Sequence, residues 1–529
     1  MTKLPSLLLA GAAAATFFAA PAMAQQKAPL QILRVIDADR YDPIRSTATA
    51  AAEVLYMLAD TLVTVDFDMK TIKPGLADSW TISPDGKTYT FKIRKDVKFC
   101  DGRPMTIDDV VYSLKRWVDP ANKSPVSFRG GQVQDIRADG DSTLIYELKE
   151  PYSDLIFQMA LSFASIIDKN SVESLGANFG VQGFNGTGPY CWVKWTPRQE
   201  LVLKKNPHYT WGPPIYKDPK PQIEDIVWKI IPEPNTLMAA IQAKQADVTY
   251  YTPYIALDTM QKIPGFTVQR QENYIYDVFM GFRVDKPVAN DKAIRQAANM
   301  ATNKEAIAKA IFFGKGQTLP SLLNPSVLDY DKSSADKMPK YDPAGAAKLL
   351  DAAGWKPGAD GIREKDGQKA TFTVYGIRNS DNPRISEAMQ ADLRKVGIDM
   401  KIQLWDATVA WGKLATQEFD AFLMSYPYVT ATEALGLYFP SRQIPTPNRM
   451  NWKDPKTDDL IRQAATATDD ATRKQAIGAV QNQLTEANVW VPLVTQPLWV
   501  VATDRVEGAR AHGLYGAGLY KGLDIKLKR

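Results

Sequence analysis

The sequence predicts an α/β protein with more than one domain, and three observations support this. A chain of 529 residues is longer than one hydrophobic core can organise. Residues 80–94 alternate between apolar and polar side chains around a turn, which predicts a β-hairpin. Residues 371–404 read as strand, helix, strand, and this spacing predicts a crossover unit and a parallel sheet.

The N-terminus has the three parts of a secretory signal peptide. A basic start, Met1–Lys3, precedes an apolar run from Leu4 to Phe18, and Ala22-Met23-Ala24 supplies the small residues of a cleavage site. A buried N-terminal helix is the alternative, but it does not explain the abrupt change to polar residues after this point. We expect a signal peptide over residues 1–24. With no Cys at the cleavage point and no later membrane-spanning run, we expect a periplasmic protein that is not a lipoprotein.

The charged residues, cysteines and histidines limit which partners, disulfides and metal sites are expected. Lys and Arg total 64 against 59 acidic residues, and no basic block forms, so neither a nucleic acid nor a membrane surface is expected as a partner. Cys100 and Cys191 are the only cysteines, and in an oxidising compartment we expect them to form a disulfide. Two buried, inert thiols are the alternative. His208 and His512 are isolated in sequence, so no metal site is predicted.

The hairpin comes first along the chain. Pro84–Lys87 has the composition of a turn, and the alternation around it predicts a buried face made of Trp80, Ile82, Tyr89, Phe91 and Ile93.

A helix should follow the hairpin. Thr106 stands three residues before Asp109, which resembles a capping box, and Val110, Leu114 and Trp117 share one helical face.

The second half of the chain carries the α/β pattern. Asp342-Pro343 predicts a helix start, with an apolar stripe of Ala346, Leu349 and Leu350 and a stop at Gly354. Beyond it, 371–375 alternates as a strand and 398–404 as another. The helix between them has its apolar residues at helical spacing, namely Ile385, Met389, Leu393 and Val396. The Pro-rich segments 206–221 and 319–343 are predicted to be surface loops.

Several long motifs resemble family 5 of the extracellular solute-binding proteins, the peptide, nickel and opine binders of ABC importers. The resemblance starts at Gly75–Trp80, continues through Pro84–Phe99 and Asp101–Leu114, and returns at Asn185–Tyr190, Ile294–Ala297 and Tyr341–Trp355. These motifs occur in order along almost the whole chain. They are specific for the family and do not specify the ligand.

The resemblance implies a two-lobed periplasmic binding protein fold (type II, cluster C-like) with an extra β-rich subdomain and a hinge. Lobe I would comprise residues 25–277 and, after a return, 497–529, with the β-rich subdomain at 55–180. Lobe II would comprise 278–496, and the hinge would lie near 276–281 and 494–497. The implied partners are a small-molecule ligand and the permease and ATPase subunits of an importer in the inner membrane. We expect a monomer without cofactors and without enzymatic activity.

The resemblance also suggests ligand-binding residues. In peptide binders an Asp holds the ligand's α-amino group, but the matching position here is Val429, and Glu433 could replace it only if the loop is drawn differently. Arg378 follows a predicted strand at the place where dipeptide binders carry a carboxylate-binding Arg. Other candidate cations are Arg129, Arg442 and Arg449. The aromatic candidates are Phe128, Trp405, Trp411, Tyr426 and Tyr428.

We therefore predict capture of a small carboxylate-bearing ligand, either a short peptide or an amino-acid-derived compound such as an opine. An oligosaccharide or a metal chelate is the alternative ligand, and a periplasmic chaperone or a chemoreceptor adaptor is an alternative role. A more distant alternative is a serine hydrolase of the penicillin-binding type, because Ser334–Lys337 spells S-x-x-K and Ser380–Asn382 spells S-D-N. The third box of that class, K-T-G, is absent after Asn382.

Overall fold

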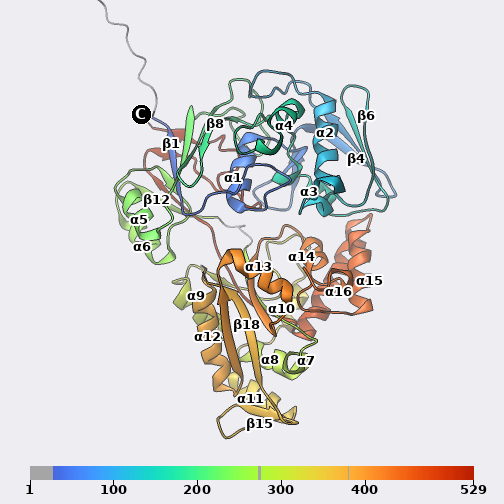
Figure 1. Ribbon diagram of the computed structural model, residues 1–529, viewed down its shortest axis with the longest axis vertical. Helices are drawn as coiled ribbons and strands as arrows, with labels where there is room; N and C mark the ends of the chain where they lie inside the picture. The colour runs from blue at the N-terminus through green and yellow to red at the C-terminus, as the bar shows by residue number, and fades with distance from the viewer. Residues whose placement is uncertain (1–27, 272–275, 379, 529) are drawn as a thin grey trace, which may run out of the picture.

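A computed structural model describes residues 28–271, 276–378 and 380–528. The predicted signal peptide lies outside the described residues. The chain forms two lobes, one above the other in Figure 1, and the described residues nearest both ends of the chain lie in the upper lobe, lobe I. In the part of the chain that the structure describes, none of the helices combines the length and the apolar composition needed to cross a membrane.

The main sheet of lobe I collects strands from both ends of the chain. β1 runs parallel to β10 and β11, and the other neighbouring strands pair antiparallel. The sheet order is β12 (Phe266–Arg270), β22 (Trp499–Thr503), β11 (Val248–Thr249), β1 (Leu30–Arg34), β10 (Asp225–Ile230), β9 (Glu200–Lys205) and β8 (Tyr190–Thr196). Helix α1 (Thr49–Leu58) is buried along nearly its whole length, since it lies between this sheet and the rest of the lobe.

A second, four-stranded antiparallel sheet forms the β-rich part of lobe I. Its order is β4 (Ala77–Ile82), β5 (Thr88–Ile93), β7 (Thr143–Leu148) and β6 (Val133–Asp139). The predicted hairpin is confirmed, and Tyr89, Phe91 and Ile93 are buried. The prediction for Ile82 is wrong, since this side chain is 46% exposed. Ile82 ends the edge strand beside the turn, where the core no longer covers it.

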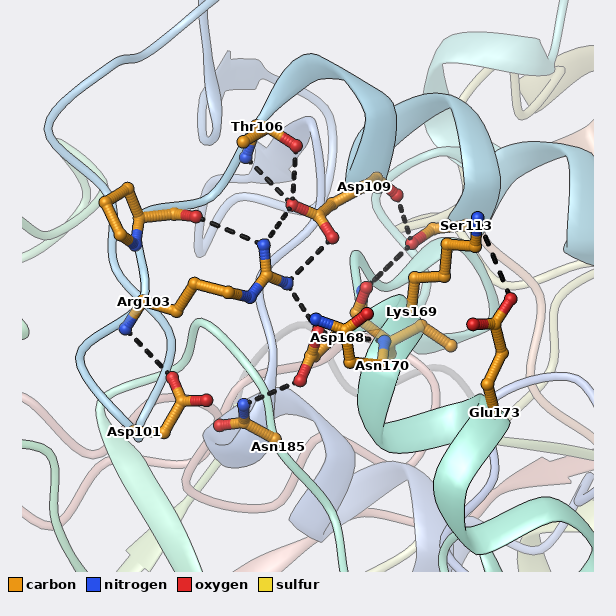
Figure 2. A network of polar contacts seen from close by, with 12 residues as sticks. Asp101, Arg103, Thr106, Asp109, Ser113, Asp168, Lys169, Asn170, Glu173 and Asn185 are labelled. Carbon is orange, nitrogen blue, oxygen red and sulfur yellow. Dashed lines mark hydrogen bonds and ion pairs between the residues drawn. The ribbon is translucent and has the colours of Figure 1, made fainter.

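Helix α2 (Ile107–Val118) follows, and its start is held by a polar network (Figure 2). The predicted capping box between Thr106 and Asp109 is confirmed. Arg103 Nη1 and Nη2 donate to the two oxygens of Asp109 over 2.9 and 2.8 Å, and Arg103 also binds Asp168, the N-cap of α4 (Lys169–Leu175). Cys100, in the same loop, is joined by a disulfide to Cys191 in β8. This loop, which lies within the motifs that resemble the family, is therefore anchored to three elements, namely α2, α4 and β8.

Lobe II is built on a six-stranded mixed sheet. Its order is β14 (Gln317–Thr318), β21 (Trp490–Thr495), β13 (Asp277–Phe282), β20 (Ala421–Tyr426), β18 (Thr371–Ile377) and β19 (Asp399–Trp405). Strand β18 is parallel to both β19 and β20, and α12 (Asn382–Lys395) connects β18 to β19. The predicted crossover unit is confirmed, with Ile385, Met389 and Leu393 fully buried.

The Pro-rich segments differ from each other. Residues 206–221 contain no helix or strand, as predicted, but Tyr209 and Trp211 are buried in the core of lobe I, so this loop does not lie wholly on the surface. Residues 319–343 include a short helix, α10 (Lys332–Lys337), which the turn-rich composition did not predict. The predicted helix after them is α11 (Pro343–Ala352), and the Asp342 side chain caps it by accepting from Gly345 N over 2.8 Å.

Two chain segments run between the lobes and lie side by side. Gln271 N donates to Leu498 O, and Gln496 N donates to Tyr276 O, both over 2.9 Å. Where the segments enter lobe II, Thr495 Oγ1 donates to the buried Asp277 carboxylate over 2.8 Å. The lobe boundaries and the hinge inferred from the resemblance stay predictions.

Candidate functional site

One edge of the lobe II sheet gathers the ends of several strands. The register pairs Ile377 with Trp405, so β18 and β19 end together, and β20, which runs on beyond its pairing with β18, ends at Tyr426 on the same edge. Tyr426 and Thr495 both pair with Asp277, which places the start of β13 and the end of β21 there as well. Because both crossing segments leave from this edge, it faces lobe I. Ligand sites in sheets of this type lie at the carboxyl ends of parallel strands.

Arg378 is the first residue after β18 at this edge, and its side chain is exposed. Its backbone N–H donates to Trp405 O over 2.8 Å, and Nη2 reaches Leu404 O at 3.4 Å. Among the described residues its guanidinium has no carboxylate partner. The structure thus places an uncompensated cation at the edge that faces lobe I.

Trp405 lies next to Arg378, at the end of β19. Its ring contacts Tyr375 edge to face at 5.9 Å, and Lys413 Nζ lies 4.7 Å from the ring centre. Within the described part of the chain, its indole Nε1 is buried without an acceptor. The Trp411 side chain is outside the described part of the structure, so its predicted role stays a prediction.

A second arginine, Arg129, lies where the lobes touch and is only 3% exposed. Its Nη1 donates to Glu433 Oε1 and to Gln158 Oε1, each over 2.6 Å, and Nη2 donates to Tyr426 Oη over 3.0 Å. The rings of Phe128 and Phe163 lie 5.3 and 5.4 Å from its guanidinium carbon. Burial lowers the pKa of this guanidinium, but the attraction of Glu433 and Tyr426 outweighs burial, so the pKa rises overall.

Glu433 comes from lobe II, in the first turn of α14 (Ala431–Tyr438). Thr430 caps this helix by accepting from Glu433 N over 2.9 Å, and Glu433 Oε2 accepts from Val429 N over 2.9 Å. The spacing of Thr430 and Glu433 is that of a capping box, a signal that could have located Glu433 from the sequence. Glu433 therefore sits beside the position of the missing acid, but its carboxylate binds Arg129.

Val429 itself packs into the hydrophobic core of lobe I and is 4% exposed. The segment from Tyr426 to Glu433 thus docks on lobe I through polar and apolar contacts together. We call this contact, made by Arg129, Asp154, Tyr426, Val429, Thr430 and Glu433, the interlobe seam.

Asp154 extends the interlobe seam. Thr430 Oγ1 donates to Asp154 Oδ1 over 2.9 Å, and the neighbouring Ser153 N–H donates to Ala465 O, at the end of α15 (Pro455–Ala465), over 2.7 Å. Burial raises the pKa of the Asp154 carboxyl to about 7, and the negative charge of Glu433 adds to this rise.

The predicted aromatic residues differ in how deeply they are buried and in which residues they contact. Tyr426 is half-buried and faces Arg129, whereas Tyr428 is 2% exposed and packs behind it with a ring separation of 5.1 Å. Phe128 is 53% exposed at the rim of the interlobe seam. The structure therefore brings Phe128, Arg129, Tyr426 and Tyr428 together, while Arg378 and Trp405 form a separate group along the same sheet edge.

The other two candidate cations lie further along lobe II. Arg442 is exposed on the short 3-10 helix Ser441–Gln443. Arg449 is 9% exposed beside Tyr438, and burial lowers the pKa of its guanidinium.

Two cavities lie along the loop after β14. One, of about 730 Å³, is lined by Gln317, Asn324 and Thr495 and by α9 (Lys304–Ile311). The other, of about 430 Å³, lies between Lys70 of lobe I and Asp329 and Lys474 of lobe II. Neither is lined by the interlobe seam or by Arg378. Side chains fill the space at the interlobe seam, so we place the candidate site by the strand ends and not by cavity size.

The residues of the serine hydrolase alternative are not arranged for catalysis. Ser334 is fully buried in α10, with its hydroxyl donating to Asp331 O over 2.7 Å, and Lys337 pairs with Glu486. In the described part of the chain there is also no cluster of three His, Cys, Asp or Glu side chains suited to a metal ion.

The sequence of residues 71–441 matches the family model of the bacterial extracellular solute-binding proteins, family 5. The oligopeptide-binding protein AppA of Bacillus subtilis is 25% identical over 503 residues, which is 92% of this chain and 90% of AppA. The nickel-binding periplasmic protein of Escherichia coli is 30% identical over 353 residues, 65% of each chain. The family consists of substrate-binding proteins of ABC transporters, which are not enzymes, so the hydrolase alternative is wrong.

Solved structures agree with this assignment. NikA from Brucella suis, in complex with Fe(III)-EDTA, is 26% identical and superposes with a TM-score of 0.82 over 94% of this chain and 99% of NikA. AppA from Bacillus subtilis, in complex with a nonapeptide, gives a TM-score of 0.78 at 23% identity, over 94% and 99% of the chains. These neighbours confirm the two-lobed periplasmic binding protein fold.

Proposed function

This chain belongs to the bacterial extracellular solute-binding proteins of family 5, and we propose that it captures a small carboxylate-bearing solute between its lobes. The observation that carries the solute class is Arg378, an exposed guanidinium without a described carboxylate partner at the strand ends that face lobe I. A guanidinium offers a carboxylate two parallel donors. Trp405 and Tyr426 on the same edge, with Trp411 and the rim residue Phe128, would supply flat contact surfaces.

Peptide binders carry an Asp at the position of Val429. The surroundings of Val429 favour an amino-acid-derived solute, such as an opine, over a peptide with a free α-amino group. Val429 is buried in the core of lobe I, and the neighbouring Glu433 is paired with Arg129. An ammonium group bound at this loop would lack a free carboxylate partner, which costs several kcal/mol when the group is buried.

The proposed role is transport. The protein would reside in the periplasm after removal of residues 1–24, close around its solute, and deliver it to a permease with paired ATPases. Membership of the family and the periplasmic relative support this role.

The test is a thermal-shift screen of the purified protein against opines, peptides, sugars and metal chelates. A binding solute raises the melting midpoint by mass action. We expect an opine or another amino-acid-derived carboxylate to do so, and we expect Arg378→Ala to reduce the rise. Arg384→Ala is the matched control, because Arg384 is exposed nearby but paired with Asp381. A response to sugars alone, or an unaltered response of Arg378→Ala, would reject the carboxylate solute.

A further inference from the structure

The Arg129 guanidinium forms a buried binding position for an anion where the two lobes touch. Of its five N–H donors, two on Nη1 bind Glu433 and Gln158, and one on Nη2 binds Tyr426. Its Nε is buried and has no acceptor among the described residues. A buried guanidinium requires a negative partner, and Glu433 Oε1 at 2.6 Å provides it.

Glu433 is held in place before any solute arrives. Its second carboxylate oxygen accepts from Val429 N over 2.9 Å, and its own backbone N–H binds the Thr430 side chain. The N-terminal end of α14 also favours a negative charge at this position. A carboxylate from solution would have to displace one that is already tethered and oriented, which is unfavourable.

Arg378 is the opposite case. It lies at the same sheet edge and is exposed, and no described carboxylate neutralises it. Arg129 and Arg378 therefore both lie near the region between the lobes, and of these two only Arg129 has a carboxylate partner among the described residues.

We propose that Glu433 is a tethered carboxylate that occupies Arg129, so that a carboxylate on the bound solute is directed to Arg378. The second half of this statement rests on the proposed function, and the first half does not. The cleft would then bind one carboxylate of the solute at Arg378 and offer it no free guanidinium at Arg129, because Glu433 already neutralises Arg129.

Acetate tests the proposal directly. Glu433→Ala leaves Arg129 facing an empty carboxylate position, so this variant should melt several degrees below the wild type in chloride buffer. Replacing chloride by acetate at equal ionic strength should raise its melting midpoint, because acetate can bind the vacated position. The double variant with Arg129→Met should show no such rise, and neither should the wild type.

Glu486→Ala is the matched control, because Glu486 forms an exposed pair with Lys337 in the same lobe. If Glu433→Ala does not fold in chloride, its refolding yield in acetate against chloride becomes the measurement, and acetate should raise the yield. Equal behaviour in the two salts would overturn the proposal. So would a wild-type response to acetate that Arg129→Met removes, since Arg129 would then be open to outside carboxylates.

The acetate result is independent of the solute. If no carboxylate solute is found, or if Arg378→Ala binds it normally, the proposed function fails while the acetate response of Glu433→Ala is unaffected. If a solute binds through Arg378 but acetate has no effect, only the tethered carboxylate is refuted.

Discussion

The interlobe seam and the sheet edge around Arg378 present the same chemical group in opposite settings. Arg129 is 3% exposed and bonded to a carboxylate, an amide and a tyrosine hydroxyl. Arg378 is exposed, with one long contact to a backbone carbonyl. A buried charge must be neutralised within the protein, whereas an exposed charge is solvated by water and is free to bind a ligand. The comparison separates an arginine that joins the lobes from one that is available to a solute.

The largest effect is expected from breaking the buried pair. Arg129→Met leaves the Glu433 carboxylate buried and unpaired, which should cost about 3–5 kcal/mol in the free energy of unfolding. Urea denaturation measures this cost. The double variant with Glu433→Leu should recover part of it, because no charge is then left unpaired. Additive losses in the double variant would show that the two residues do not act as a pair.

Val429→Asp should cause the next largest loss in the free energy of unfolding. It places a carboxylate in the apolar core of lobe I, so we expect a loss of about 2–4 kcal/mol, measured in the same way. Val409→Asp is the matched control, because Val409 is 45% exposed on α13 (Ala407–Thr416) and its replacement should change stability by less than about 0.5 kcal/mol. Similar losses at the two positions would contradict the burial of Val429 between the lobes.

The third largest effect is expected from pH, through the contribution of Asp154 to the free energy of unfolding. The pKa of Asp154 is about 7 in the folded protein and about 4 when the chain is unfolded, so the folded state binds the proton more tightly. The resulting stability is fully present below pH 4 and is lost as the pH rises through 7. Across this window, the stability of the wild type relative to Asp154→Asn should fall by roughly 1–4 kcal/mol. A difference that is constant with pH would show that Asp154 does not titrate in this range.

The smallest change in stability is expected at Arg378. Arg378→Ala removes an exposed side chain with one weak contact, so the free energy of unfolding should change by less than about 0.5 kcal/mol. The affinity for a carboxylate solute should nevertheless fall by at least about tenfold, because a charge-assisted hydrogen bond is lost. Isothermal titration with a solute from the screen measures this. A large loss of stability without a loss of affinity would reverse the roles assigned to the two arginines.

Local patterns predicted the elements that depend on neighbouring residues. The hairpin, the capping box at Thr106 and the crossover unit from β18 to β19 were readable because side-chain period and turn composition act over a few residues. Ile82 was mispredicted because alternation shows which face a residue is on, but not where the core ends. The helix α10 was missed within a turn-rich segment for a similar reason, since composition describes a stretch and not its packing.

The sequence by itself determined the family, the α/β class and most of the elements that build the lobe II edge, because long motifs and periodic patterns record local constraints. It also singled out Arg378 as the carboxylate-binding candidate and Arg129 as a further candidate cation. Only the tertiary structure showed that Glu433 neutralises Arg129, since these two residues are 304 positions apart in the chain and meet where the two lobes touch. No local pattern encodes such a contact. Which of the two charges is neutralised, and which is open to a solute, follows from burial, and burial is a property of the assembled fold.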